Sequence, residues 1–200
     1  QPLCKDPATG RYRLPWVRLH AIRGYYDILA VLDEFPDVRQ TFNFSPSLLL
    51  QIDEYASGEA GDIFLDVARK PAEDLSADER VFILQHFFSA NRDAMISPYP
   101  RYRELLEKRG PHAATEALAS VQKTFSVEDM RDLQVWANLA WFGYSARKQR
   151  PQMRELLEKG RGFTEEEKRA MLDTQLELIT ELLPRYRAAQ EAGRIEISVS

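Results

Sequence analysis

The sequence predicts an α/β fold that is helical over most of its length, and two observations lead to this prediction. Two short segments, 39–44 and 194–200, alternate apolar and polar residues as strands do. About 150 residues of mostly helical periodicity lie between them, whereas the crossover of a βαβ unit needs only about 10–12. The chain therefore combines strands with a long helical insertion.

The composition is that of a folded domain without a basic excess. The chain has 200 residues, of which 44% are hydrophobic and 29% are charged, enough to bury a core. Lysine and arginine total 27 against 31 acidic residues, and the charge runs 101–107 and 165–168 are expected to be solvated helix faces. No apolar run approaches the ~20 residues that cross a bilayer. We therefore expect neither nucleic acid nor a membrane as a partner, and a cytoplasmic location.

Cysteine and histidine are too few for a cross-link or a common metal site. Cys4 is alone and the three histidines, His20, His86 and His112, are scattered, which excludes an internal disulfide and gives no zinc spacing. The sequence has no glycine-rich phosphate loop, no Gly-x-Ser-x-Gly elbow and no His-Glu-x-x-His motif. We expect no metal and no cofactor, and these residues alone identify no reaction.

The first part of the chain predicts a loop followed by a helix. Turn formers and charges dominate 1–14, and Pro15 then opens a helix over 16–35. Pro36 ends this helix. Its apolar face is predicted from residues spaced by three and four, namely Ile22, Tyr25, Tyr26, Leu29 and Leu32.

Asn43 is the strongest local candidate for binding a ligand. It lies near the end of the predicted strand 39–44, on the face opposite Phe42 and Phe44. Ligands of parallel α/β folds gather at the carboxyl ends of strands, which favours a binding role for its amide. An equal alternative is that Asn43 caps the turn into the next helix, where Ser45 is already suited to that role.

The remaining elements are marked by their caps and breaks. Helices are predicted to start at Ser45-Pro46, Ser76, Ser126 and Thr164, the last three with capping boxes or close variants. Glycine or proline marks ends and breaks at Gly58, 98–100, 110–111 and Gly193. The helices that start at Ser76, Ser126 and Thr164 are predicted to bury, in that order, Val81, Leu84, Phe87 and Phe88; Met130, Leu133, Trp136, Leu139 and Ala140; and Met171, Leu172, Leu176, Ile179 and Leu183.

Two pairs of side chains have both a structural and a functional interpretation. Trp16 and His20 are four residues apart and share a helix face, where a lone histidine is more often a packed or surface residue than a catalyst. Trp136 and Trp141 lie in a stretch too apolar for an exposed helix. This favours packing over a platform that stacks on sugar rings.

Four stretches of the sequence carry a resemblance to a known family. They are Gln1-Pro2; Pro-Trp-Val-Arg-Leu-His-Ala at 15–21 with Tyr-Tyr-Asp at 25–27; Thr-Phe-Asn-Phe-Ser-Pro-Ser-Leu-Leu at 41–49; and Asp-Leu-Gln-Val-Trp at 132–136 with Asn-Leu-Ala-Trp-Phe at 138–142. Together and in this order they resemble glycoside hydrolase family 57, in particular its bacterial α-amylase/α-mannosidase-like members and 4-α-glucanotransferase relatives. The resemblance covers essentially the whole chain.

The resemblance implies a distorted (β/α)7 barrel, of which this chain holds an incomplete part. It implies barrel elements over 1–58, a helical insertion over 59–193 and the start of the next barrel strand over 194–200. The opening strand of the family ends in His-Gln-Pro, and Gln1-Pro2 match the last two letters. Because the first residue is not methionine and the last strand stops abruptly, we expect a piece of a longer protein.

The family's reaction is retaining hydrolysis or transfer at α-glucosidic bonds, with a glutamate nucleophile and an aspartate acid/base on later strands. The resemblance therefore implies no catalytic residue within 1–200. It implies that the chain forms one wall of the sugar cleft, with Gln1, Trp16, His20 and Asn43 as substrate-binding residues. The implied partner is an α-glucan or an oligosaccharide.

Two other functions remain open from the sequence. One is a non-catalytic helical interaction module that keeps the fold without the chemistry. The other is a different carbohydrate enzyme on a similar barrel, of the α-mannosidase or polysaccharide deacetylase type. Such an enzyme would usually need metal-binding histidine and aspartate residues, and the sequence shows no cluster of them.

Overall fold

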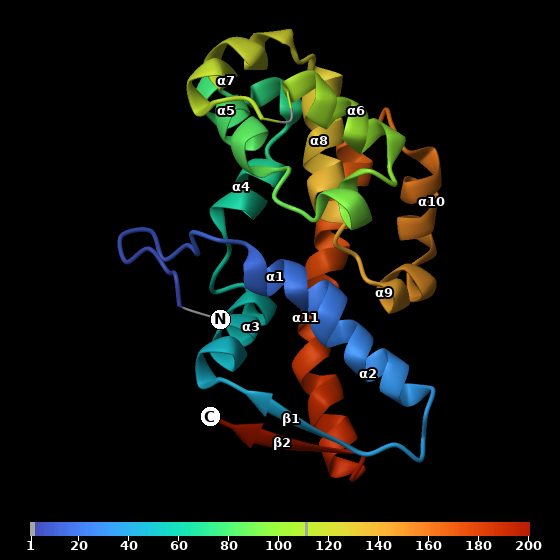
Figure 1. Ribbon diagram of the computed structural model, residues 1–200. Helices are drawn as coiled ribbons and strands as arrows, with labels where there is room; N and C mark the ends of the chain where they lie inside the picture. The colour runs from blue at the N-terminus through green and yellow to red at the C-terminus, as the bar shows by residue number, and fades with distance from the viewer. Residues whose placement is uncertain (1–2, 111) are drawn as a thin grey trace. The chain divides into compact units, whose positions relative to one another are not determined.

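The computed structural model describes residues 3–110 and 112–200, which are mainly helical (Figure 1). Their strands are β1 (Gln40–Phe44) and β2 (Ile195–Val199), which pair in parallel as a two-stranded sheet. Both predicted strands and the predominance of helix are confirmed. Sequence periodicity was sufficient here because each strand alternates apolar and polar side chains.

The chain divides into two compact units, and the sheet belongs to the first. The first unit comprises Gln1–Leu65, Phe142–Arg150 and Asp173–Ser200. The second comprises Asp66–Trp141 and Pro151–Leu172. The helical region between the strands therefore contributes residues to both units.

The first helical run contains a π-helical turn that residue spacing did not predict. The run consists of α1 (Trp16–His20), η1 (Ala21–Tyr25) and α2 (Tyr26–Asp33), so it ends two residues before the predicted Phe35. Its predicted apolar residues are buried, except that Tyr25 is half-buried. A π-helical turn is wider than an α-helical one and changes the partners of its carbonyl groups.

Two carbonyl groups of η1 accept hydrogen bonds from distant parts of the first unit. The oxygen of Ile22 accepts from the amide of Gly143 at 3.2 Å, and the oxygen of Tyr25 accepts from the hydroxyl of Tyr186 at 2.9 Å. Tyr186 belongs to α11 (Glu165–Glu191). The π turn thus joins the first helical run to the segment around Gly143 and to the second half of α11.

Asp27 fixes the helix that follows Gly143. Its carboxylate accepts from the amides of Tyr144 and Ser145, each at 2.9 Å, and so caps the start of α9 (Tyr144–Gln149). A Cβ atom on Gly143 would overlap this carboxylate, lying 2.6 Å from its carbon. Glycine is therefore required at this position as long as Asp27 caps the helix.

The helix after β1 begins and ends as predicted. Ser45 Oγ accepts from the amide of Leu48 at 3.3 Å, and Pro46 is the first residue of α3 (Pro46–Ser57). Gly58 follows the helix with φ of 77°, a conformation in which a Cβ is disfavoured. These local signals place the helix directly at the carboxyl end of β1.

A buried ion pair joins the helices of the first unit. Arg18 and Asp62 are 1% and 0% exposed, and Arg18 Nε donates to Asp62 Oδ2 at 2.8 Å. The same carboxylate accepts from the Tyr55 hydroxyl at 2.8 Å and from the Leu65 amide at 2.7 Å, and Arg18 also donates to Gln175. Burial raises the pKa of Tyr55, so its hydroxyl remains a donor. The pair ties α1, α3, α11 and the helix start after Asp62 together.

The second unit is built from helices, two of which continue into the first unit. They are α4 (Ile63–Arg69), η2 (Ala72–Asp74), α5 (Ala77–His86), η3 (Arg92–Ile96), α6 (Pro100–Arg109), α7 (Thr115–Val121), η4 (Gln122–Thr124), α8 (Val127–Leu139), α10 (Pro151–Lys159) and α11. The capping boxes predicted at Ser76, Ser126 and Thr164 are confirmed. In each box, the hydroxyl of the capping residue accepts a hydrogen bond from the backbone amide three residues later. The carboxylate of that later residue accepts a hydrogen bond from the backbone amide of the capping residue.

The predicted core residues are confirmed in α8 and only in part elsewhere. All five predicted residues of α8 and its C-cap are buried. In α5, Val81 is half-buried and Ile83 is buried instead. In α11, Leu176 and Leu183 are half-buried whereas Leu182 is buried. The prediction of buried residues is least accurate in α11 because this helix buries side chains around much of its circumference.

The prediction that the run 165–168 is a solvated face is wrong at Lys168, which is 1% exposed. Its ammonium group donates to the Lys70 carbonyl at 2.7 Å and to the Gln134 side chain at 2.9 Å, and it pairs with Glu165 at 2.8 Å. Gln134 itself donates to the carbonyls of Val67 and Lys70. These two side chains thus satisfy carbonyl groups at and just beyond the end of α4.

The run 101–107 is likewise not fully solvated, because Arg101 is buried against α8. Its guanidinium pairs with Asp129 and Asp132, each at 2.8 Å. Lys108 also reaches Asp129, at 2.7 Å. Burial alone would raise the pKa of Asp129, but hydrogen bonds from Lys108, the Ser126 amide and Arg101 outweigh burial and lower it from 3.8 to about 2.

We expect the Asp62→Ala variant to lose about 3–5 kcal/mol of unfolding free energy, because it leaves the Arg18 charge buried without its partner. Urea denaturation followed by circular dichroism would measure the loss. Asp53→Ala removes an exposed acid from the same region and should change the free energy by less than about 0.5 kcal/mol. Equal small losses in the two variants would contradict the importance of the ion pair.

The Asp129 carboxylate should make the protein less stable as the pH falls. Its folded pKa of about 2 lies below the usual 3.8, so the unfolded chain takes up a proton first and the stabilisation is lost from about pH 5 downward. Between pH 6 and pH 3, the wild type should lose about 1 kcal/mol more unfolding free energy than Asp129→Asn, as measured by urea denaturation at each pH. Parallel pH profiles for the two proteins would rule this out.

Candidate functional site

One face of the two-stranded sheet is polar. The parallel register puts Thr41 opposite Glu196 and Asn43 opposite Ser198. Residues two apart in a strand, and residues directly opposite each other, point to the same face. These four side chains therefore lie together on one side of the sheet.

Asn43 forms hydrogen bonds with Ser198 of β2 and with Ser200, the residue after β2. We call these three residues the Asn43 cluster. Asn43 Nδ2 donates to Ser198 Oγ at 3.0 Å, and Ser200 Oγ donates to Asn43 Oδ1 at 2.7 Å. Nearer the amino ends of the strands, the Thr41 hydroxyl separately donates to Glu196 at 3.3 Å. The cluster thus occupies the carboxyl ends of both strands.

The opposite face of the sheet packs against α11. The rings of Phe42 and Phe44 meet the ring of Tyr186 edge-on, with centroids 5.7 and 5.1 Å apart. Phe44 is buried whereas Asn43, between the two rings in sequence, is exposed. The packing of Tyr186 thus decides which face of the sheet is covered and leaves the Asn43 cluster on the face that α11 does not cover.

The alternative that Asn43 caps the following helix is wrong. Ser45 accepts the amide hydrogen bond at the start of α3, as described above. The Asn43 amide instead reaches across to β2. Because ligands of parallel sheets gather at the carboxyl ends of strands, this position remains suited to binding.

Trp16 and His20 share a face of α1, and both are half-buried. Figure 1 shows α1 separated from the strand pair within the first unit. The predicted residue Gln1 lies outside the described residues. Within residues 3–110 and 112–200, the side chain of Asn43 has Ser198 and Ser200 as its hydrogen-bond partners and not Trp16 or His20.

His20 has an altered acidity. Burial first, and the positive charge of Arg23 second, lower its pKa from the usual 6.5. The imidazole is thus neutral at pH 7, where it has one hydrogen-bond donor and one acceptor.

The packing interpretation is confirmed for the two tryptophans of the helical region. Trp136 is 1% exposed, stacks on Tyr99 at 4.6 Å and on Tyr102 at 6.1 Å, and donates from Nε1 to the Gly160 carbonyl at 3.0 Å. Trp141 is also buried. Neither ring offers a free face on which a sugar could stack.

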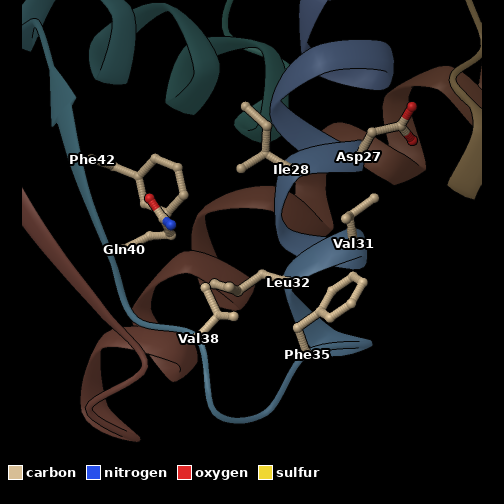
Figure 2. A pocket seen from close by; sticks show the side chains of 8 residues that line it. All are labelled: Asp27, Ile28, Val31, Leu32, Phe35, Val38, Gln40 and Phe42. Atoms are coloured by element: carbon tan, nitrogen blue, oxygen red, sulfur yellow. The ribbon is translucent and has the colours of Figure 1, made fainter.

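A groove beside the sheet is almost entirely apolar. It has a volume of about 390 Å³ and is lined by α2, β1 and the loop between them, as Figure 2 shows, through Asp27, Ile28, Val31, Leu32, Phe35, Val38, Gln40 and Phe42. The Asp27 carboxylate points away from the groove in Figure 2, in keeping with its role as the cap of α9. The groove suits apolar groups better than sugar hydroxyls.

Residues 3–110 and 112–200 offer neither a cluster of metal ligands nor a membrane-spanning helix. These residues contain no group of three histidine, cysteine, aspartate or glutamate side chains that could hold a metal ion. Their helices include none that is long and apolar enough to span a membrane.

Sequence reasoning missed the partners of Asn43. The alternation in 194–200 already puts Glu196, Ser198 and Ser200 on one face, which was the available signal. The alternation does not give the register in which the two strands pair, and a shift of one residue would have turned those side chains to the other face.

The comparison with protein families agrees with the resemblance described above. A model of glycosyl hydrolase family 57 matches residues 1–200, the whole chain. No curated protein and no solved structure gives a significant match. The family assignment therefore rests on a match that includes both strands, the Asn43 cluster and the helices between them.

The charge of Arg23 should be measurable in the titration of His20. We expect the His20 ring to titrate below 6.5 and Arg23→Ala to move its pKa part of the way back, since burial remains. An NMR titration of the ring protons would measure both values. Arg23→Lys keeps the charge and should leave the pKa near that of the wild type. A midpoint at or above 6.5 in the wild type would contradict this assignment.

Proposed function

The chain belongs to glycosyl hydrolase family 57, and we propose that it forms one wall of the sugar cleft of a retaining α-glucan hydrolase or glucanotransferase. The observation that carries this proposal is the Asn43 cluster at the carboxyl ends of two parallel strands. In βα barrels the active site is built at that end of the strands.

In this proposal, β1 and β2 are neighbouring strands of the distorted (β/α)7 barrel expected for the family. Their parallel pairing supports it, because parallel strands need a long crossover and here the helical region provides one. The packing of α11 on the apolar face also supports it, since helices cover the outer face of such barrels. The helices between 59 and 193 are then an insertion between two barrel strands.

The proposed roles of the site residues follow from their chemistry. The Asn43 amide binds sugar hydroxyls, because a carboxamide can donate and accept at the same time. Trp16 contributes a ring for stacking and neutral His20 a hydrogen-bonding group farther along the cleft, with Gln1 completing the same wall. The glutamate nucleophile and the aspartate acid/base lie outside residues 1–200 and perform the double displacement of a retaining enzyme.

The proposal predicts activity on α-glucans that depends on Asn43. The assay uses a protein that includes the segments beyond residues 1 and 200, because the proposal puts the catalytic carboxylates there. Maltooligosaccharides and starch should be hydrolysed or redistributed, and a chelator should have no effect. Asn43→Ala should lower kcat/KM about tenfold or more, because the variant loses one or two hydrogen bonds to the sugar.

Thr41→Ala is the matched control, because Thr41 lies on the same face, pairs with Glu196 and takes no part in the proposed contacts. It should retain the activity of the wild type. Turnover of mannosides that a chelator abolishes would replace the proposal with a metal-dependent enzyme. Absence of turnover on every glycan tested would replace it with a non-catalytic interaction module.

A further inference from the structure

We propose that Ser198 and Ser200 are positioning residues that hold the Asn43 carboxamide in one orientation, so that it meets two neighbouring hydroxyls of one sugar ring. This inference rests on the proposed function, in which Asn43 contacts the substrate. It adds two residues to the site and a stated substrate chemistry, a pair of adjacent free hydroxyls.

A chain of hydrogen bonds determines which way the amide points. A backbone carbonyl can only accept, and Ser198 Oγ donates its single hydrogen to the Phe42 oxygen through a long bond of 3.5 Å. Ser198 Oγ must then accept from Asn43, which requires the nitrogen of the amide on that side. The amide oxygen consequently faces Ser200, whose hydroxyl donates to it at 2.7 Å.

The reversed amide would keep neither contact unless the serines rearranged. With Nδ2 and Oδ1 exchanged, the oxygen would face a Ser198 hydroxyl whose hydrogen is already used, and the nitrogen would face Ser200. Ser200 could adapt by rotating its hydroxyl, but Ser198 could adapt only by giving up the Phe42 carbonyl. The serines thus favour one of the two amide orientations, and Ser198 determines which one.

The fixed amide has unused hydrogen-bonding capacity on an exposed face. A carboxamide has two N–H donors and two lone pairs, and the serines engage one of each. The second donor and the second lone pair belong to the same planar group, and Asn43 is exposed. They can meet two adjacent hydroxyls, one accepting and one donating, which is the pattern offered by neighbouring carbons of a pyranose.

Orientation by the serines should strengthen binding. An exposed asparagine that rotates freely must be ordered when a ligand binds, whereas one already held by two bonds loses less freedom. A site that hydrogen-bonds both hydroxyls also disfavours a sugar that lacks one of them, because a polar group is then left without its partner. Removing a serine should therefore reduce both affinity and this selectivity.

The first test measures binding of maltotetraose by NMR titration to the same protein as the activity assay, which includes the segments beyond residues 1 and 200. Asn43→Ala should abolish detectable binding, and Ser198→Ala and Ser200→Ala should each weaken it about threefold to tenfold. Ser200→Thr keeps the hydroxyl and should bind nearly as the wild type does. Thr41→Ala is the control on the same face and should leave the affinity unchanged.

The second test follows the side-chain amide signals of Asn43 in a ¹⁵N–¹H spectrum and needs no sugar. In Ser198→Ala and Ser200→Ala these signals should shift and exchange faster with solvent, while the unfolding midpoint stays within error of the wild type. Signals that are unchanged in both variants would overturn the positioning role, whatever the sugar does.

The two tests separate the failure of this inference from failure of the proposed function. If the wild type does not bind maltotetraose but the Asn43 signals respond to the serine variants, the sugar contact fails and the orientation of the amide stands. If Asn43→Ala abolishes binding while both serine variants bind as the wild type does, the proposed function stands and the positioning inference is wrong.

Discussion

The first unit depends on the burial of one charged pair, Arg18 and Asp62. Two charges out of water are tolerated only if their hydrogen-bonding groups are satisfied, and here a tyrosine of α3, a glutamine of α11 and a backbone amide complete the set. This requirement has a structural result beyond stability. β1 leads directly into α3 and β2 follows α11, so the network that holds these two helices together also sets where the strands leave them.

The candidate site is a product of that arrangement rather than of any sequence motif. Asn43 comes from β1 and the serines from the other end of the chain, and they meet only because two parallel strands lie in one register. Tyr186 then decides which face of the sheet is covered. Polar side chains of two separate strands thereby form a cluster at the carboxyl ends of β1 and β2. Many parallel sheets bind their ligands at this end of the strands.

Local signals predicted what local interactions determine. Strand alternation, the N-caps at Ser45 and Ser76 and the glycine after α3 each act within a few residues, and each was predicted correctly. Lys168 and Arg101 were misjudged because the groups that bury them, such as the carbonyl of Lys70, are distant in sequence. The partners of Asn43 were missed for the same reason: alternation gives the face of a strand, and only the folded sheet gives its register.

The π-helical turn η1 has a consequence for the way this chain is compared with its relatives. An α-helix advances about 100° per residue, so one residue more or less within 21–25 changes the rotation of α2 relative to α1 by that angle. Arg18 lies before the turn and Asp27 after it, and each must face its own partner. A family member that is one residue shorter here could keep one of these contacts in place but not both. An alignment gap in this stretch would therefore mark relatives in which one of these two contacts is replaced.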